Sequence, residues 1–384
     1  MRFRKFLKTL GIIAGLEIVT AAVGFMLFIY SAAPVFENLR TLWIETAMTT
    51  MSHQWLATAF FPQETIDSVM GKQVVDFDGI GGIDLDLEPE PEESRGPVTL
   101  VEQKEIDILG QKFLSVGGLD WAGNEILVND IDQGIIISDI KSKNYHGWAI
   151  IVDDPSRIHM TGTTLRGDRG EQIMDFYDRE DAIFACNASG FSDPGGNGSG
   201  GHVAGACMMQ GELWGNYTST YVTFGFDDQN RFVVGTFSNW EDYHIRDAAQ
   251  FIPALIINGE QLISGTAGWG LQPRTVMGQR ADGSVVFLVV DGRQPGYSTG
   301  IAMGQCADIL MSYGCVNAAA CDGGSSSVFV YNGEIMNKYS TPRQGGRRLP
   351  NAWIVTKKHT TEDNSTQDVV FLEKDPAESE TSKN

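Results

Sequence analysis

The sequence predicts an α+β fold, in which a mixed twisted sheet with flanking helices follows a single N-terminal transmembrane helix. Short apolar runs separated by Gly, Asn and Asp predict many strands, and two segments with helical spacing lie among them. An apolar run near the N-terminus predicts the transmembrane helix. Apolar residues make up 42% of the chain and aromatic residues 10%, which is enough to build a packed core.

The N-terminal region predicts a membrane anchor. Four basic residues come first, Arg2, Arg4, Lys5 and Lys8, and the apolar run 10–33 then carries a single charge, Glu17. Such a run can span a bilayer, and positive charge on its N-terminal side places that end in the cytoplasm. We therefore expect residues 1–33 to form a cytoplasmic stub and a single-pass anchor in the cell membrane, with the following domain extracytoplasmic. The small residues Ser31-Ala32-Ala33 leave a cleaved signal peptide as the alternative.

The rest of the chain divides into four segments. Residues 34–75 have apolar side chains at roughly helical spacing and predict an amphipathic juxtamembrane helical segment. Residues 76–97 are acidic and proline-rich, which predicts a linker. Residues 98–359 are expected to form one catalytic domain, and residues 360–384 a disordered acidic tail. A scaffold that forms homo-oligomers through Pro34–Phe61 remains an alternative role.

The charge and cysteine content limit the partners that we expect. The chain has 49 acidic and 28 basic side chains, a net charge of −21, which disfavours binding to nucleic acid. An anionic substrate must then meet a local positive patch, so single arginines are informative. The cysteines, at positions 186, 207, 306, 315 and 321, lack the close spacing of zinc ligands, and we expect them to be small buried apolar residues. We expect no metal and no cofactor.

Individual elements can be predicted within the domain. Strands are expected at Ile135–Ile137, Trp148–Val152, Tyr221–Phe226 and Phe232–Phe237. Helices are expected at Glu171–Arg179 and from an N-cap at Ser298 or Thr299 to a stop at Gly314. This mixture favours α+β over all-β.

Two Asp-Gly sequences follow predicted strands. Val285–Val290 ends in Asp291-Gly292-Arg293-Gln294, and Val316–Cys321 ends in Asp322-Gly323-Gly324, followed by three serines. A helix separates the two strands, and such a crossover usually makes the strands parallel, which would bring both corners to the same edge of the sheet. The two carboxylates would then face one crevice. Either corner alone could also be an ordinary turn.

Paired carboxylates beside an arginine fit the cleavage of a bond between a sugar and a phosphate. One carboxylate can act as a general acid and the other as a base or nucleophile. The guanidinium of Arg293 can hold a phosphodiester through paired hydrogen bonds and neutralise charge on the departing phosphate. The sequence leaves open whether Asp291 or Asp322 is the acid.

The ordered set of motifs resembles the phosphodiester glycosidase family. The set comprises Arg274-Thr275, Asp291-Gly292-Arg293-Gln294, Asp322-Gly323-Gly324, Asn332-Gly333, Arg347 and Asn351. Upstream, Asp154-Pro155 and residues 185–191 are similar to two further family segments, so the resemblance covers about Tyr145 to Thr356. It implies a hydrolase that cleaves a sugar-1-phosphodiester, of N-acetylglucosamine type or within an envelope glycopolymer. The bacterial relatives that it implies are commonly related to exopolysaccharide or the cell envelope.

The resemblance also implies the site residues. Asp291, Arg293 and Asp322 match the family's core acidic and basic residues and are the expected catalytic groups. The expected substrate-binding residues are Asn187, Arg274, Gly292, Gln294, Gly323, Gly324, Ser325, Ser326, Arg347 and Asn351. Ser325 and Ala188 stand where the family usually has glycine, which favours the alternative of a non-catalytic module that binds glycan phosphates or assists exopolysaccharide assembly. Asn332-Gly333 is expected to be a hairpin turn.

Overall fold

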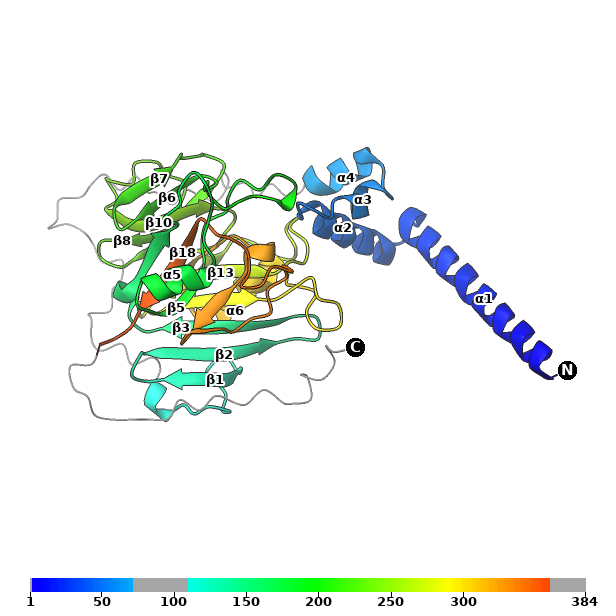
Figure 1. Ribbon diagram of the computed structural model, residues 1–384, viewed down its shortest axis with the longest axis horizontal. Coiled ribbons are helices and arrows are strands. Elements are labelled where there is room, and N and C mark those ends of the chain that lie inside the picture. Colours follow the sequence, from blue (N-terminus) through cyan, green and yellow to red (C-terminus); the bar gives the residue numbers. More distant parts are fainter. Residues whose placement is uncertain (1, 72–109, 360–384) are drawn as a thin grey trace.

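The computed structural model of the chain describes residues 2–71 and 110–359 (Figure 1). The predicted linker 76–97 and the predicted tail 360–384 lie outside the described residues. The described part consists of an N-terminal helical segment and a larger body that contains three sheets and two helices.

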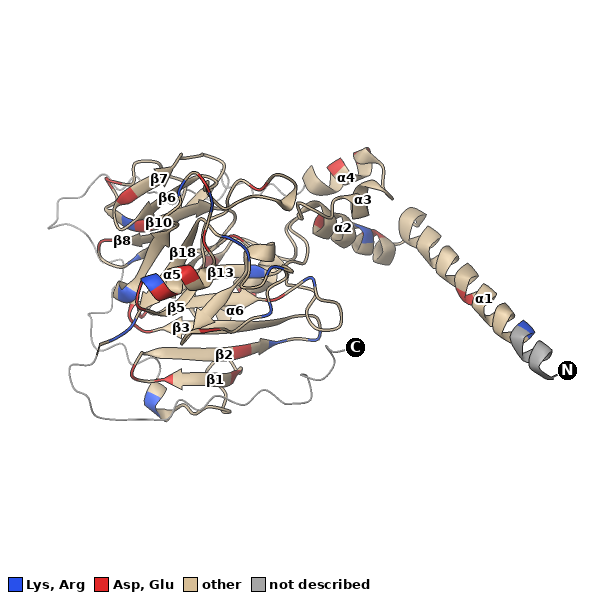
Figure 2. Cartoon of the chain, in the orientation of Figure 1, with Lys and Arg blue, Asp and Glu red and all other residues tan. Residues whose placement is uncertain are grey.

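Helix α1 (Arg2–Tyr30) extends away from the rest of the chain (Figure 1). Its apolar stretch, Lys8–Tyr30, is 23 residues long, and none of it is buried inside the molecule. Charged residues are sparse along this stretch, as Figure 2 shows. A helix of this length and composition can cross a membrane, and a signal sequence has the same properties. Helix α1 is therefore a candidate membrane anchor or signal sequence.

Three short helices, α2 (Pro34–Met48), α3 (Trp55–Thr58) and α4 (Gln63–Met70), pack together beside the body. Their shared core is formed by Ile44, Ala47, Ala57, Phe61, Ile66 and Val69, and Phe28 of α1 packs against it. The Arg40 guanidinium donates hydrogen bonds to the carbonyls of Phe28 (2.9 Å) and Ser31 (2.7 Å) at the end of α1. These contacts hold the bend between α1 and α2.

An eight-stranded sheet forms the centre of the body. Its strand order is β1-β2-β3-β14-β13-β15-β11-β12, and each of these neighbouring pairs is antiparallel. The strands are β1 (Glu125–Asp130), β2 (Ile135–Lys141), β3 (His146–Val152), β11 (Ala254–Ile257), β12 (Glu260–Gln261), β13 (Arg274–Arg280), β14 (Val285–Val290) and β15 (Cys315–Ala320).

Two five-stranded antiparallel sheets complete the body. One has the order β7-β6-β10-β8-β9 and the other β17-β16-β5-β18-β4. The strands of the first are β6 (Ala206–Met209), β7 (Glu212–Gly215), β8 (Val222–Asp227), β9 (Phe232–Gly235) and β10 (Ile245–Phe251). Those of the second are β4 (Ile158–Gly162), β5 (Ala182–Asn187), β16 (Phe329–Tyr331), β17 (Glu334–Ile335) and β18 (Asn351–Thr356). Short 3₁₀ turns lie at Gln111–Phe113, Pro155–Arg157, Pro194–Gly196 and Gly324–Ser326.

Strand β14 lies between two hydrophobic cores, which explains why it is an unbroken apolar run. Its side chains alternate, so that Val285, Phe287 and Val289 enter the core shared by all three sheets. The intervening Val286, Leu288 and Val290 pack under helix α6 (Met303–Ser312). Helix α5 (Ile173–Arg179) covers a third core on the sheet that contains β5. The central sheet is thus covered on both faces.

The predicted α+β class is confirmed, with the strands divided among three antiparallel sheets. The helix expected from Ser298 or Thr299 is wrong in its start, because Ser298 bonds to the Asp291 carbonyl and Ile301 pairs with Gln272 before α6 begins. The hairpin at Asn332-Gly333 is confirmed between β16 and β17. All five cysteines are buried and free, as expected.

Candidate active site

The ends of β14 and β15 lie at the same edge of the central sheet. Both strands are antiparallel to β13, which lies between them, so they run in the same direction. Asp291 directly follows β14, and Asp322 follows β15 by two residues. Arg274, the first residue of β13, pairs with Val290 at this edge. The predicted parallel arrangement is confirmed, with β13 inserted between the two strands.

Asp322 is the more accessible carboxylate at this edge. Its Oδ1 accepts a hydrogen bond from the Gly323 amide (2.9 Å), and the Ser326 hydroxyl donates to the same side chain. Burial raises the pKa of Asp322 to about 6, although Ser326 and Arg347 act in the opposite direction. A carboxyl group with this pKa exchanges protons readily near neutral pH, as general acid–base catalysis requires.

Arg293 lies next to Asp322 on the turn that follows β14. Its Nε donates to Oε1 of Gln272 (2.8 Å) and its Nη1 donates to Oγ of Ser325 (3.0 Å). The guanidinium lies close over Gly324, where a Cβ would come within 2.9 Å of Nη2. Burial lowers the pKa of Arg293 to about 10, while Asp322 opposes this change. Arg293 therefore stays cationic at neutral pH and is held in one orientation.

Arg347 and Asp193 form a bidentate ion pair beside Asp322. Nη1 and Nη2 of Arg347 donate to the two carboxylate oxygens of Asp193 at 2.7 and 2.9 Å. The guanidinium also stacks over the Phe191 ring, 4.7 Å from its centroid. Burial tends to raise the pKa of Asp193, but Arg347 and the Gly198 amide hold it below its usual value. The charge of Arg347 lowers the pKa of Asp322, and that of Asp193 raises it.

Arg274 is a third arginine at the same edge, and it is buried. Its Nη2 donates to the carbonyls of Trp269 (2.8 Å) and Gly270 (3.3 Å). Burial lowers its pKa to about 10, and Arg293 adds to this effect. A Cβ at Gly323 would lie 3.7 Å from Cδ of Arg274, so the Asp322 turn passes directly over this side chain. Three arginines thus lie near the Asp322 turn in a chain whose net charge is −21.

Asn187 is buried and holds the backbone of the Asp322 turn. Its Nδ2 donates to the Asp322 carbonyl (2.6 Å). Its Oδ1 accepts from the Thr275 hydroxyl (2.7 Å) and the Val328 amide (3.2 Å). These bonds use the side chain within the protein, so Asn187 positions the site.

Asn351 is also buried, and its contacts lead away from Asp322. Its Oδ1 accepts from the Ser189 amide and its Nδ2 donates to the Ser189 hydroxyl, both at 2.9 Å. This pair joins the start of β18 to the segment after β5. Asn351 therefore supports the 187–193 segment from which Asp193 extends.

Asp291 is 1% exposed, and its oxygens are occupied by protein donors. Oδ1 accepts from Nδ2 of Asn337 (2.9 Å), and Oδ2 accepts from the Lys338 amide (2.9 Å) and the Tyr297 hydroxyl (3.0 Å). Burial raises the pKa of Asp291, and these three donors oppose the change. Asp322 therefore lies within the charge influence of Asp193 and Arg347, whereas Asp291 anchors the segment after β17.

The remaining predicted residues shape the turns of the site. Gly292 has no room for a side chain, because a Cβ would lie 2.7 Å from the Pro273 nitrogen. Gln294 donates through Nε2 to the Lys338 carbonyl (2.6 Å). Ser325 and Ser326 bind Arg293 and Asp322 respectively.

Sequence reasoning missed two residues that hold the arginines. Asp193 pairs with Arg347, and Gln272 accepts a hydrogen bond from Arg293. Both lie close in sequence to predicted residues, since Asp193 follows Phe191 by two positions and Gln272 precedes Arg274 by two. Their roles depend on contacts between distant loops, so the local pattern gave little signal.

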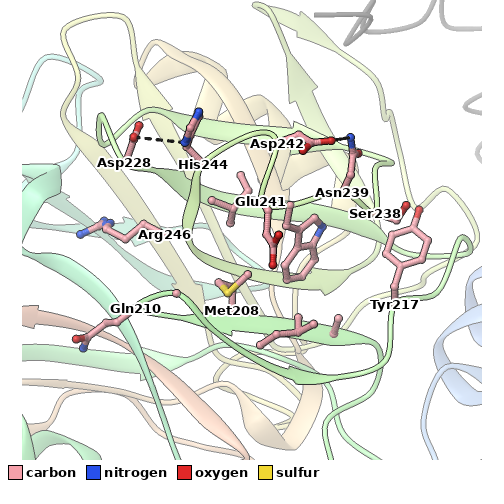
Figure 3. Close-up of a pocket in the computed structure, with 15 residues that line it drawn as sticks. Met208, Gln210, Tyr217, Asp228, Ser238, Asn239, Glu241, Asp242, His244 and Arg246 are labelled. Atoms are coloured by element: carbon pink, nitrogen blue, oxygen red, sulfur yellow. Dashed lines mark hydrogen bonds and ion pairs between the residues drawn. The ribbon is translucent and has the colours of Figure 1, made fainter. Parts of the chain in front are cut away.

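A surface hollow of about 680 Å³ lies elsewhere, over β6 and β10 (Figure 3). Its acidic and imidazole groups, Asp228, Glu241, Asp242 and His244, are exposed, and the Asp228–His244 pair is 3.9 Å apart. Exposed groups of this kind are screened by solvent. Its lining includes none of the predicted site residues. We therefore place the candidate site at the Asp322 turn, on chemical grounds rather than on cavity size.

Comparison with known families finds a match over part of the chain. Residues 180–356 match the family model described as "Phosphodiester glycosidase". The matched segment contains Asp193, Arg293, Asp322 and Arg347. The resemblance predicted from the sequence is thereby confirmed over these residues.

One curated relative is the SPbeta prophage-derived uncharacterized protein YomE of Bacillus subtilis (strain 168). It is 30% identical over 200 residues, which are 49% of this chain and 29% of the relative. The chain thus spans less than a third of that relative's length.

Two solved structures show more distant similarity. A hypothetical protein from Synechocystis matches with a TM-score of 0.50 and 13% identity, over 61% of this chain and 64% of that protein. The zebrafish N-acetylglucosamine-1-phosphodiester alpha-N-acetylglucosaminidase catalytic domain, auto-inhibited by its pro-peptide, matches with a TM-score of 0.47 and 19% identity. That match covers 58% of this chain and 82% of the zebrafish domain. The Synechocystis match shows a likeness of fold alone.

Proposed function

Since this chain resembles the phosphodiester glycosidases over residues 180–356, we propose that it hydrolyses the bond between the anomeric carbon and the phosphate of a sugar-1-phosphodiester. The observation that carries the proposal is Asp322, whose pKa burial raises to about 6. It lies beside Arg293 and within the charge influence of Arg347. A proton-exchanging carboxylate next to cations fits a substrate that has both a glycosidic bond and a phosphate.

In the proposed reaction, water adds to the anomeric carbon and the bond from this carbon to the phosphate oxygen breaks. Ionised Asp322 accepts a proton from the attacking water. The electron pair of the broken bond stays on the phosphate oxygen, so the second product leaves as a phosphomonoester. Arg293 neutralises the charge that develops on this group, and because phosphate is a good leaving group, electrostatic stabilisation matters more than protonation.

The other charged residues support these two groups. Arg347, held by Asp193, adds positive charge near the phosphate and keeps part of the Asp322 population ionised. Arg274 lies below the turn and contributes to the same field. We assign Asp291 a positioning role, because its oxygens bind Asn337, Lys338 and Tyr297.

The location of the reaction follows from α1. Basic residues before an apolar helix favour a cytoplasmic N-terminus, so the body of three sheets lies outside the membrane in this proposal. Sugar phosphodiesters of the cell envelope are then accessible substrates. N-acetylglucosamine phosphodiesters and envelope glycopolymers are the first to test.

The test uses the full-length protein in detergent with N-acetylglucosamine 1-(methyl phosphate), as separate α and β anomers. Release of N-acetylglucosamine and of methyl phosphate in equal amounts supports the proposal. Asp322→Asn is expected to lower sugar release by at least about a hundredfold, since one proton-transfer group is lost. Its melting temperature should stay close to that of the wild type. Full activity in the Asp322→Asn variant contradicts the assignment.

A second candidate function is a non-catalytic module that binds glycan phosphates. It is favoured by Ser325, whose hydroxyl occupies Nη1 of Arg293 where a substrate phosphate could bind. Binding of envelope glycan phosphates without sugar release from any of them would support this alternative. The same assay therefore separates the two functions.

A further inference from the structure

Gln272 joins the active-site arginine to the N-terminal helices. Its Oε1 accepts a hydrogen bond from Nε of Arg293 (2.8 Å), and its Nε2 donates to the Thr46 carbonyl (2.8 Å) and to Oγ1 of Thr49 (3.0 Å). An arginine side chain can only donate hydrogen bonds and a carbonyl can only accept them. These partners therefore fix the orientation of the Gln272 amide, with Oε1 toward Arg293 and Nε2 toward α2. Gln272 is 2% exposed and has no access to alternative partners in water.

The end of α2 also fits closely against the segment that carries Gln272. The Thr46 hydroxyl accepts from the Leu271 amide (3.1 Å), and the Thr49 hydroxyl lies 3.3 Å from the Trp269 carbonyl. Gly270 has a φ of +58°, and a Cβ there would lie 2.5 Å from the Thr46 nitrogen. Only glycine allows this approach of the two backbones. Residues of both segments thus make this contact, Thr46 on α2 and Gly270 on the segment that carries Gln272.

The same helical segment reaches the loop on the other side of Asp322. A Cβ at Gly196 would lie 3.5 Å from Cβ of Ser52 and 3.8 Å from Cβ of Met51. Gly196 belongs to the loop that begins at Asp193, the partner of Arg347. Residues 46–52 therefore touch both loops that hold an active-site arginine.

We propose that the α2–α3 region supports the phosphate-binding site. In this proposal the region fixes the position of Gln272, and Gln272 is a positioning residue that in turn holds Arg293. This inference rests on the proposed function, because it concerns the arginine that binds the substrate phosphate. Gln272 fixes Nε of Arg293, which leaves the Nη groups to face Ser325 and the substrate. The N-terminal helical segment thereby determines phosphate affinity from outside the family-matched residues 180–356.

The test compares Thr49→Val with Thr50→Val in the full-length protein. Both changes replace a threonine after α2 by a valine of similar shape and so remove one hydroxyl. Among the described residues, the Thr50 hydroxyl bonds to Ala47 and His53, both within the helical segment. The readout is the Kd for methyl phosphate, from ³¹P NMR titration, beside the Kd for N-acetylglucosamine, from ¹H NMR titration. Thr49→Val should raise the Kd for methyl phosphate about fivefold, which corresponds to one hydrogen bond. Thr50→Val should change the Kd for methyl phosphate less than about twofold. Neither variant should change the Kd for N-acetylglucosamine.

A double-variant cycle shows whether the effect passes through Arg293. In an Arg293→Lys background the Nε partner of Gln272 is absent, so Thr49→Val should have no further effect on phosphate binding. Equal Kd values for Thr49→Val and wild type, or an unchanged Thr49 effect in the Arg293→Lys background, overturn the inference. Methyl phosphate binding that depends on Thr49, without sugar release by the wild type, overturns the proposed function alone. Failure of the wild type to bind methyl phosphate overturns the inference as well.

Discussion

The carboxylate of Asp193 accepts two hydrogen bonds from the Arg347 guanidinium, at 2.7 and 2.9 Å, and this pair lies within charge influence of Asp322. The second carboxylate near Asp322 is therefore Asp193, which comes from the loop after β5. Its charge and that of Arg347 act on the pKa of Asp322 with opposite signs. Burial is the main cause of the raised pKa of Asp322, and the ion pair adjusts this pKa as well as fixing the position of Arg347.

Replacement of Asp193 by Asn should shift the pH profile. Ionised Asp322 is the proposed active form, so kcat/KM of the wild type falls as the pH falls through about 6. Asp193 raises the pKa of Asp322, and its removal leaves the opposing Arg347 unpaired. The acidic limb should therefore move to lower pH in Asp193→Asn.

The matched control for this change is Asp228→Asn. Asp228 is exposed in the turn after β8, and its replacement alters the net charge by the same amount. The acidic limb should keep its wild-type position in this variant. An acidic limb that stays in place in Asp193→Asn, or moves equally in both variants, contradicts the assigned role.

Replacement of Gly324 by Ala should reduce activity more than stability. The φ of Gly324 is +62°, which costs a side chain roughly 1 kcal/mol, and the new methyl would press on Nη2 of Arg293. Displacement of a substrate-binding group is expected to lower kcat/KM about tenfold or more. Gly333→Ala is the control, since Gly333 has a φ of +82° with nothing within 4 Å of a Cβ. Urea unfolding should show similar losses of stability in the two variants. Sugar release should be retained in Gly333→Ala and reduced in Gly324→Ala. Equal activity in the two variants would rule out this role for Gly324.

The strands and the corners of the site were predictable because their signals are local. Val285–Val290 is apolar throughout since both faces of β14 are buried, and the predicted and observed bounds agree. The direction of β15 relative to β14 followed from the intervening helix. Asp193 and Gln272 were not predictable, because their partners, Arg347 and Thr46 of α2, lie far away in sequence. The start of α6 was misplaced because Ser298, which resembles an N-cap, instead bonds to the Asp291 carbonyl.

Removal of the Ser325 hydroxyl should strengthen phosphate binding. The hydroxyl accepts a hydrogen bond from Nη1 of Arg293, which is then freed for the substrate. One additional hydrogen bond to a phosphate is expected to lower the Kd for methyl phosphate about threefold or more. Ser325→Ala and Ser325→Gly should behave alike if the hydroxyl is the cause. Unchanged binding in both variants shows that Ser325 does not compete with the phosphate.

Replacement of Asn187 by Ala should destabilise the fold. It leaves the Asp322 carbonyl, the Thr275 hydroxyl and the Val328 amide without their buried partner. The expected loss is about 2–4 kcal/mol of unfolding free energy, measured by urea denaturation. Asn197→Ala is the control, because Asn197 is exposed and bonds locally to the Gly195 carbonyl. Its unfolding free energy should stay within about 0.5 kcal/mol of the wild type, and an equally small loss at Asn187 would contradict its positioning role.

The bond that breaks is the most direct test of the proposed glycosidase activity. Hydrolysis of N-acetylglucosamine 1-(methyl phosphate) in H₂¹⁸O, followed by mass spectrometry of both products, locates the oxygen taken from water. Attack on the anomeric carbon, with Asp322 as the base, predicts ¹⁸O in the released sugar and none in methyl phosphate. Rapid analysis and a control with unlabelled products exclude later exchange at the anomeric hydroxyl. Recovery of ¹⁸O in the phosphate would show attack at phosphorus and contradict the proposed reaction.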